Sequence, residues 1–490
     1  MNRKKSLSVV IPAIVFVSIA AGVVFGYFLA DGNNEVSRKS GSEKLRQVIG
    51  LIDRMYVDSV NTDSIVDIVL KDVTNRLDPH SIYLTGEETD KENQELEGQY
   101  TGIGIAFSMM RDTPMVTRVF ANGPSYGKLC PGDKILAVDG KNIIFTQFDS
   151  IPYLIKGKEG TKVKLKILRR PDTAAFVVEV NREKVQIQSV IGYMVDDSIG
   201  YIKITNFGRK TYNEFVNTAK QLQKEGMGKL ILDLRGNPGG ILGAVVKILD
   251  EFFDSQQLLC FLKSREKIEQ KCYSKPGGLL VKTPVVVLID NGSASASEIL
   301  AGAMQDNDRA VIIGTRSFGK GLVQSEFDLG DGSSVRLTTA RYYTPSGRSI
   351  QKSYDSYDAV RGHKLGHNIV DTAEYKTKNG RTVKGGGGIY PDVFVEDTLY
   401  ASYLYRLKEL DFIDKYGYQL CNIKRPEDLL RFASKKGYKD FAVVYSVMTD
   451  LLPTSDAYKY YNEHSVVFAK AYEILRNGKW KEYLKSTSDE

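Results

Sequence analysis

Cysteine and histidine are both scarce in this 490-residue chain, which argues against several kinds of site. The four cysteines are scattered and none forms a CxxC pair, so the spacing typical of a zinc site is missing. We therefore expect no metal centre. Cys260 and Cys272 flank a charged, hairpin-like segment and could form a disulfide, which the sequence does not decide.

A compact arginine-rich stripe is also missing, although the net charge is +7 and the pI about 8.8. Much of the excess lies in the first five residues and in a lysine-rich tail near the C-terminus. A nucleic-acid-binding surface would concentrate such charge on one face. We therefore expect a solvated basic surface and no nucleic-acid partner. The composition, 42% hydrophobic and 26% charged, is that of a globular protein long enough for several domains.

A long uncharged run stands at the N-terminus. Residues 1–5, MNRKK, carry three positive charges, and residues 6–30 carry no charge. That run is longer than the apolar part of a signal peptide and long enough to span a bilayer. Because positive residues stay in the cytoplasm, we expect a single-pass anchor in the inner membrane and a periplasmic or other extracytoplasmic catalytic domain. The alternative is a long signal peptide cleaved near residues 20–21.

Two segments of different pattern follow. Residues 31–97 begin as a polar tether and continue as amphipathic helices, of which one is predicted from Ser64 to Leu77, where Asp78-Pro79 ends it. Residues 98–184 contain short β-branched runs separated by Gly, Pro, Asn and Asp. The pattern of residues 98–184 therefore predicts a small β-rich module.

The rest of the chain alternates strand and helix and then becomes helical. Residues 185–398 predict helices at 212–225, 242–253 and 298–306, each after a buried strand. This alternation indicates an α/β core with functional loops after the strands. Residues 399–490 are helical in pattern and rich in Tyr and Lys, and packing, oligomerisation or adaptor binding are all compatible with them.

Residues 311–324, VIIGTRSFGKGLVQ, match most of the sequence motif of a phosphate-binding loop. Gly314, Gly319 and Lys320 fit that motif, but Gly321 stands where a Ser or Thr would bind Mg²⁺. The residues that follow alternate and contain two turns, so they predict a hairpin rather than the helix that would bind phosphate. We therefore expect no nucleotide partner.

A serine-containing turn, GSASASE, spans residues 292–298 between a buried strand and a helix. Such a turn can expose a nucleophile, although Ser295 or Ser297 could equally cap the helix. The usual base would be a histidine, but none of the four lies in a suitable motif: His80, His363, His367 and His464. A lysine can replace it when desolvation lowers its pKa, and Lys320, between two glycines, suits that role.

A third motif, DLRGNPGG, spans residues 233–240 at another strand end. Its glycine pair can turn backbone N–H groups toward a developing oxyanion, or can form an ordinary turn. In this order the three motifs resemble the C-terminal processing peptidases, also called tail-specific proteases, which are serine proteases with a Ser/Lys dyad. LDPHSIYL is similar to the family's N-terminal helical motif, GQYTGIGIAF to its PDZ domain, and GGGGIYPDVFV to the segment that closes its catalytic domain.

This resemblance implies a multidomain α/β fold. The protease core would be ClpP/crotonase-like, with an inserted β-rich PDZ domain, an N-terminal helical region and a C-terminal helical extension. It further implies Ser295 as nucleophile, Lys320 as general base and Gln324 as the residue that orients the lysine. The oxyanion hole would combine the N–H of Ala296 with one from Gly239 or Gly240. No cofactor would be needed.

The PDZ resemblance implies the substrate class. A PDZ domain adds a peptide as a strand and binds its terminal carboxylate with backbone N–H groups. The residues expected at this site are Gly102, Ile103, Gly104, Ile105 and Phe107. We therefore expect protein substrates with apolar C-termini, although Tyr126 and Cys130 depart from the usual PDZ pattern. The alternative to an active endopeptidase is a gated or catalytically inactive PDZ scaffold that binds such tails.

Overall fold

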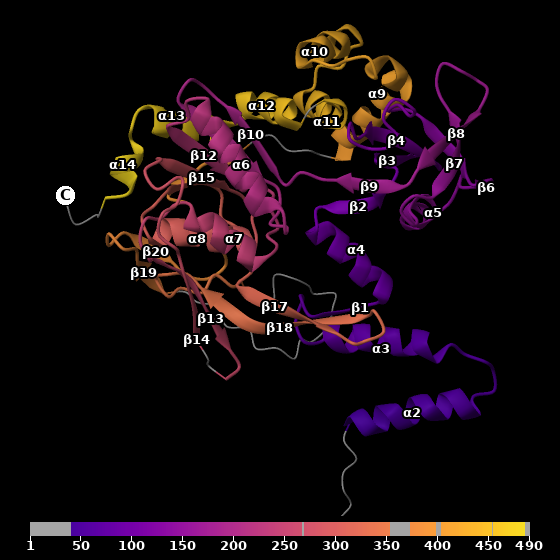
Figure 1. Ribbon diagram of the computed structural model, residues 1–490, viewed down its shortest axis with the longest axis horizontal. Coiled ribbons are helices and arrows are strands. Elements are labelled where there is room, and N and C mark those ends of the chain that lie inside the picture. The colour runs from indigo at the N-terminus through magenta and orange to yellow at the C-terminus, as the bar shows by residue number, and fades with distance from the viewer. Residues whose placement is uncertain (1–40, 267–268, 353–372, 398–402, 453, 486–490) are drawn as a thin grey trace, which may run out of the picture. The chain divides into compact units, whose positions relative to one another are not determined.

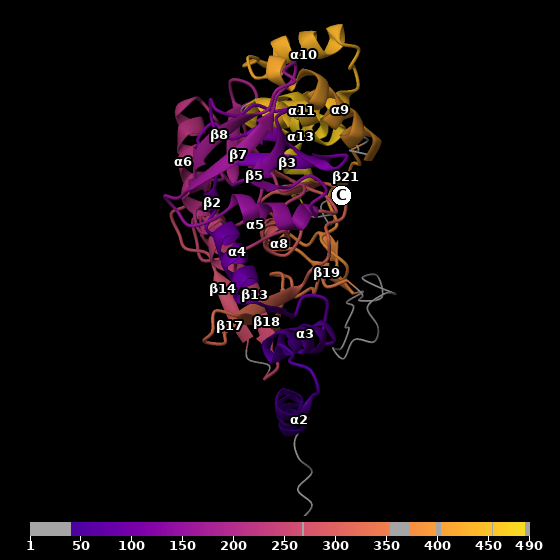
Figure 2. The ribbon, with the colours of Figure 1, turned by 90° about the vertical axis from the view of Figure 1, so that its right-hand side faces the viewer.

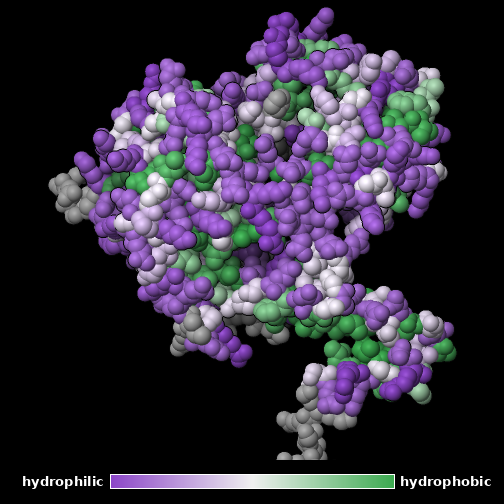
Figure 3. Space-filling view, in the orientation of Figure 1, coloured by the Kyte–Doolittle hydropathy of each residue, from purple (hydrophilic) through white to green (hydrophobic). Residues whose placement is uncertain are grey.

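The computed structural model describes residues 41–266, 269–352, 373–397, 403–452 and 454–485. The chain divides into two compact units, residues 1–72 and residues 73–490. The first contains α2 (Gly41–Met55) and most of α3 (Thr62–Asn75), which confirms the predicted amphipathic helices. Figure 3 shows apolar side chains gathered over these helices.

None of the described helices is long and apolar enough to cross a membrane. The run expected to do so, residues 6–30, lies outside the described residues.

The β-rich module is a sheet of order β3-β4-β5-β7-β8, with β6 beside β5 (Figure 1). Alternate residues of its strands point inward, and Val116, Ile135 and Leu165 are fully buried in its core. Two further strands, β2 and β9, pair antiparallel where the chain enters and leaves the module. The bounds are β2 (Gln99–Gly102), β3 (Ile105–Met110), β4 (Thr113–Val119), β5 (Lys134–Val138), β6 (Lys141–Asn142), α5 (Ile151–Ile155), β7 (Lys162–Leu168), β8 (Phe176–Asn181) and β9 (Glu183–Gln186).

The α/β core is a six-stranded sheet of order β10-β11-β12-β15-β16-β21, parallel except for β10. The predicted helices are confirmed, although α7 ends at Asp250 rather than at residue 253 and α8 begins at Ala296 rather than at residue 298. The glycine-rich loop and the Ser295 turn follow the parallel strands β12 and β15, at the strand ends where the sequence predicted them. The bounds are β10 (Val190–Met194), β11 (Ile199–Ile204), α6 (Thr211–Lys224), β12 (Lys229–Asp233), α7 (Leu242–Asp250), β15 (Val285–Ile289), α8 (Ala296–Asp306), β16 (Val311–Gly314) and β21 (Val393–Phe394).

A second sheet lies against this core and carries the hairpin predicted after Lys320. Its order is β1-β18-β13-β14, with β17 beside β18. Because a strand follows Lys320, the structure lacks the helix that a phosphate-binding loop requires there. The bounds are β1 (Ile82–Leu84), α4 (Gly86–Leu96), β13 (Leu258–Ser264), β14 (Glu269–Tyr273), β17 (Leu322–Asp328), β18 (Ser334–Tyr343), and the separate hairpin β19 (Glu374–Lys376) and β20 (Thr382–Lys384).

The C-terminal extension is helical, as predicted, and contacts both other parts of this unit. Helices α9 and α11 pack on β3 and β4 of the β-rich module (Figures 1 and 2). Helix α13 covers the face of the six-stranded sheet opposite α6, α7 and α8. The bounds are α9 (Tyr403–Leu420), α10 (Pro426–Lys435), α11 (Phe441–Leu451), α12 (Thr454–His464), α13 (Val466–Arg476) and α14 (Trp480–Tyr483).

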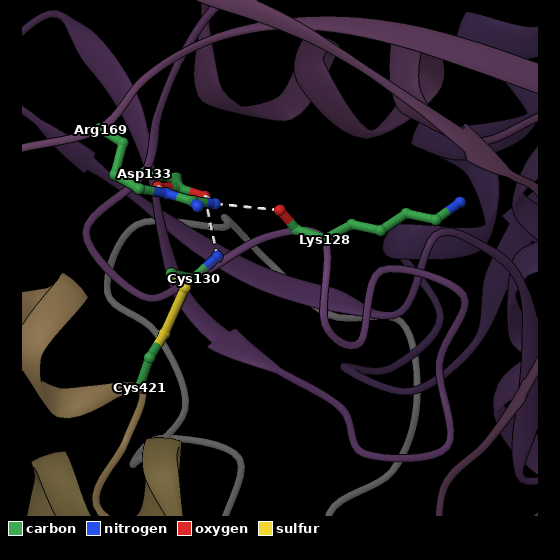
Figure 4. The surroundings of a disulfide bond; sticks show 5 residues. All are labelled: Lys128, Cys130, Asp133, Arg169 and Cys421. Atoms are coloured by element: carbon green, nitrogen blue, oxygen red, sulfur yellow. Dashed lines mark hydrogen bonds and ion pairs between the residues drawn. A yellow bond between two sulfur atoms is a disulfide. The ribbon is translucent and has the colours of Figure 1, made fainter. Parts of the chain in front are cut away.

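A disulfide joins the β-rich module to this extension. It links Cys130 and Cys421, whose Cα atoms are 6.0 Å apart (Figure 4). The pair considered from the sequence is not bridged: Cys260 and Cys272 face each other on β13 and β14 as free thiols. The sequence offered no signal for the observed pairing, because the two bonded cysteines are 291 residues apart.

Candidate active site

Ser295 occupies a sharp turn between β15 and α8. Its backbone has φ 54° and ψ −112°, a region that residues with a side chain rarely adopt. Such strain is found at functional turns, including turns that present a serine at the start of a helix. Ser295 is also the N-cap residue of α8, so the two interpretations of this turn are compatible.

Glu298, one helical turn further on, connects the Ser295 turn to the Lys320 turn. Its side chain is completely buried. One carboxylate oxygen accepts the N–H of Ser295 at 2.9 Å and the N–H of Lys320 at 2.8 Å. The other accepts the N–H of Gly319 at 2.7 Å and the hydroxyl of Ser317 at 2.5 Å. Burial raises the pKa of Glu298 to about 7.

Lys320 is largely desolvated, and this burial lowers the pKa of its ammonium group from the usual 10.5. The nearby positive charge of Arg336 lowers that pKa further, while the carboxylates of Asp78 and Glu298 raise it. A lysine with a lowered pKa is neutral more often and can accept a proton. Among the described residues, no hydrogen bond joins Lys320 Nζ to Ser295 Oγ.

The glycine-rich loop after β12 lies directly against the Ser295 turn. The carbonyl of Asn237 accepts the N–H of Ala294 and the hydroxyl of Ser297, both at 2.9 Å. Gly239 has φ 102°, and a Cβ there would lie 2.9 Å from both the Ser295 Cβ and the Ala296 nitrogen. A glycine is therefore required where the two segments meet.

The two glycines of this loop use their N–H groups differently. The N–H of Gly239 donates to Asn237 Oδ1 at 2.8 Å. Within the described residues, the N–H groups of Gly240 and Ala296 have no acceptor. Because an oxyanion hole needs free donors, the geometry favours Gly240 over Gly239 as the partner of Ala296.

Among the described residues, no hydrogen bond joins Gln324 to Lys320. Gln324 Nε2 donates to Thr338 Oγ1 at 3.2 Å, from β17 across to β18. Its role in orienting the lysine therefore stays a prediction.

Sequence reasoning missed three residues around the site. Glu298 could have been found, because Ser295 and Glu298 have the S-x-x-E spacing of a helix capping box. Tyr342 of β18, whose hydroxyl donates to the Ser295 carbonyl at 3.2 Å, has no local signal because strand pairing brings it there. Arg235, within DLRGNPGG, makes buried contacts with residues beyond position 396.

The loop expected to bind a carboxylate joins β2 to β3. Within the described part of the chain, the N–H groups of Ile103 and Gly104 have no acceptor. The side chains of Ile105 and Phe107 are half-buried, and the Phe107 ring lies 5.3 Å from that of Phe148. The side chain of Ile103, which was also expected at this site, is 1% exposed and packs in the module's core.

Comparisons with known proteins identify the family of this chain. The model of peptidase family S41 matches residues 198–360, and that of the PDZ domain matches residues 101–180. A carboxy-terminal-processing protease of Bartonella bacilliformis is 32% identical over 324 residues, which are 65% of this chain and 74% of that protein. The chain belongs to the carboxy-terminal processing proteases of family S41. It is thus a serine-type peptidase with a PDZ domain, as the resemblance implied.

One further relative and one solved structure are also similar to this chain. The carboxy-terminal processing protease CtpB of Bacillus subtilis is 30% identical over 330 residues, covering 66% of this chain and 68% of that protein. A solved structure titled photosystem II D1 C-terminal processing protease is 25% identical, with a TM-score of 0.40, over 72% of this chain and 86% of that chain.

Proposed function

We propose that this protein is a membrane-anchored serine endopeptidase that recognises free C-terminal tails through its PDZ domain and cleaves with Ser295 and Lys320. The carboxylate of Glu298 carries this proposal, because it accepts the backbone N–H groups of both residues. A single buried group thereby holds together the backbone of the two turns that carry the nucleophile and the base.

The reaction would proceed through an acyl-enzyme. Neutral Lys320 takes the hydroxyl proton as Ser295 Oγ attacks the peptide carbonyl. The N–H groups of Ala296 and Gly240 bind the oxyanion. Lys320 then gives the proton to the leaving amine, and water hydrolyses the ester.

Substrate selection would take place at the loop between β2 and β3. The N–H groups of Ile103 and Gly104, which have no acceptor among the described residues, can bind a terminal carboxylate while the peptide pairs with β3. The half-buried Ile105 and Phe107 would then contact the last side chain, which favours apolar C-termini.

The anchor and the location rest on the sequence. Residues 6–30 would span the inner membrane, with residues 1–5 in the cytoplasm and the peptidase outside it.

A gated or inactive scaffold is the second candidate. It is favoured by one observation: among the described residues, Lys320 Nζ and Ser295 Oγ share no hydrogen bond. In the active state the lysine side chain would turn toward the serine.

Cleavage of matched substrates tests both candidates. The full chain in detergent would be incubated with an unstructured protein that ends in apolar residues, and with the same protein ending in Asp-Asp. Intact mass spectrometry would identify the products of wild type, Ser295→Ala and Lys320→Arg. We expect cleavage by wild type alone, with the apolar tail preferred, since an arginine stays protonated and cannot act as base. Tail binding without cleavage by wild type would support the scaffold, and cleavage by Ser295→Ala would refute the proposed nucleophile.

A further inference from the structure

The side chain of Arg235 links the strand that precedes the glycine-rich loop to the C-terminal extension. Arg235 is 8% exposed, and its Nε and Nη2 donate to Asp233 Oδ2 at 3.0 and 2.6 Å. Asp233 ends β12 and also accepts the Tyr201 hydroxyl at 2.7 Å. The guanidinium therefore folds back over the end of its own strand.

The other N–H groups of Arg235 donate to residues from later in the chain. Nη1 binds Ser465 Oγ at 2.9 Å and Asp397 Oδ2 at 3.0 Å, while Nη2 binds Asn462 Oδ1 at 2.9 Å. Asn462 and Ser465 are each 2% exposed. All three acceptors lie outside residues 198–360, which match the S41 family.

These acceptors are themselves held in place. Asn462 Nδ2 donates to the Tyr193 hydroxyl at 2.8 Å. Ser465 caps α13 by accepting the N–H of Phe468, and the Phe468 side chain packs on the six-stranded sheet. The position of the Arg235 guanidinium is therefore fixed both by its own strand and by α12 and α13.

A displacement of Arg235 would also shift the nucleophile turn, because the next two residues are hydrogen-bonded to that turn or to the strand end before it. The next residue, Gly236, donates its N–H to Asp290 Oδ1 at 2.7 Å. The residue after it, Asn237, accepts two hydrogen bonds from the Ser295 turn through its carbonyl and one from the Gly239 N–H through its side chain. Strand end, glycine-rich loop and nucleophile turn are thus connected without a break.

We propose that Asn462 and Ser465 are positioning residues for peptide cleavage: by fixing Arg235, they hold the glycine-rich loop so that the Gly240 N–H faces the oxyanion. The inference rests on the proposed function. Removal of either acceptor leaves a buried guanidinium N–H unpaired, which favours a shift of the side chain toward another partner. The C-terminal extension, whose role the sequence left open, then contributes these two positioning residues to the protease core.

The expected kinetic signature is a loss of kcat without a change in KM. An oxyanion hole binds the transition state and not the ground state, so its displacement leaves substrate binding intact. Loss of a whole donor lowers kcat by about 10²–10³, so we expect about a 10-fold loss from displacement of one.

The test compares alanine and conservative variants of the full chain in detergent. Asn462→Ala and Ser465→Ala remove the acceptors, whereas Asn462→Asp and Ser465→Thr keep an oxygen at the same place. Thr449→Ala is the matched control, because the Thr449 hydroxyl lies in the same extension but donates to the Ser446 carbonyl within α11. The measurements are kcat, KM, thermal unfolding, and inhibition by a peptide aldehyde that forms a tetrahedral adduct with the serine.

We expect both alanine variants to lose kcat and aldehyde affinity together, while KM stays within about twofold of the wild-type value. We expect Asn462→Asp and Ser465→Thr to have kcat and aldehyde affinity close to those of wild type. Wild-type kcat in folded alanine variants would overturn the inference. So would losses that follow only the thermal unfolding temperature and are not restored by the conservative variants. If wild type itself does not cleave, the proposed function fails; if it cleaves and the variants match it, this inference alone fails.

Discussion

The charges around Lys320 determine how readily it becomes a base. Burial is the main cause of its lowered pKa, and the positive charge of Arg336 adds to it. The negative charges of Asp78 and Glu298 act in the opposite direction. Because the lysine must be neutral to accept the serine proton, cleavage should increase with pH through a pKa below 10.5.

Two substitutions should move this pH dependence in opposite directions. Arg336→Gln removes a like charge, so the lysine pKa should rise and the rising limb of kcat/KM should move to higher pH. Asp78→Asn removes an opposite charge, so the limb should move to lower pH. The measurement is kcat/KM against pH for both variants and wild type. A shift of both variants in the same direction would show that the limb does not report Lys320.

At this scale the sequence was most informative where residues carry local motifs. Ser295 and Lys320 stand in short glycine-rich turns after apolar strands, and such turns can be recognised without a structure. Tyr342 could not be found, because only the pairing of β13, β17 and β18 brings its hydroxyl to the Ser295 carbonyl. The choice between Gly239 and Gly240 depended on the hydrogen bond that the Gly239 N–H donates to the Asn237 side chain.

Among the structural elements, the glycine-rich loop packs tightly against the nucleophile turn. A Cβ on Gly239 would lie 2.7 Å from the Ala294 carbonyl oxygen, and its φ of 102° is unfavourable for alanine. Gly236 in the same loop has φ 67°, but among the described residues, its own chain neighbours aside, no heavy atom lies within 4 Å of its Cβ position. Alanine at Gly236 would therefore introduce backbone strain alone, whereas alanine at Gly239 would introduce both backbone strain and a steric clash.

Gly239→Ala should reduce kcat by about 10²-fold or more, because it pushes the loop away from Ser295 and disturbs the oxyanion hole. Gly236→Ala should keep most of the activity. It should lower the free energy of unfolding by only roughly 1–2 kcal/mol, because alanine is strained in the left-handed conformation. Cleavage assays and thermal unfolding of both variants check this. Equal losses of activity would argue against a steric origin.

Helices α6, α7 and α8 were predictable because each follows a buried strand and has helical periodicity. The placement of α13 on the opposite face of the sheet could not be predicted from the sequence. Its apolar side chains, such as Phe468 and Ile474, indicate a buried face but not what buries it. Long-range packing of this kind leaves no pattern in the local sequence.

For the whole second unit, residues 73–490, the C-terminal extension joins the PDZ domain to the protease core. Besides the disulfide, Lys134 of β5 forms an ion pair with Asp414 of α9 at 2.8 Å. Met115 of β4 is completely buried in the core of the helical extension. The order of the segments could be predicted from the sequence. The contacts that join the C-terminal extension to the PDZ domain and the protease core could not, because they link residues far apart in the chain.

The disulfide should contribute to stability by restricting the unfolded chain, typically about 2–4 kcal/mol. Cys421→Ser should therefore lower the thermal unfolding temperature under oxidising conditions and abolish its dependence on reductant. Cys272→Ser is the matched control, since that thiol is free. Thiol titration of denatured wild type should find two of the four cysteines free. Four free thiols in protein kept oxidised would contradict the pairing.

Covalent labelling of the serine tests the Ser295/Lys320 assignment most directly. A peptidyl phosphonate that ends in an apolar residue would be added to wild type, Lys320→Ala and Lys320→Arg, and peptide mass mapping would locate the adduct. We expect a single adduct on Ser295 in wild type and none above background in either lysine variant. An adduct on another serine, or labelling of Lys320→Arg at the wild-type rate, would contradict the proposed nucleophile or the proposed base.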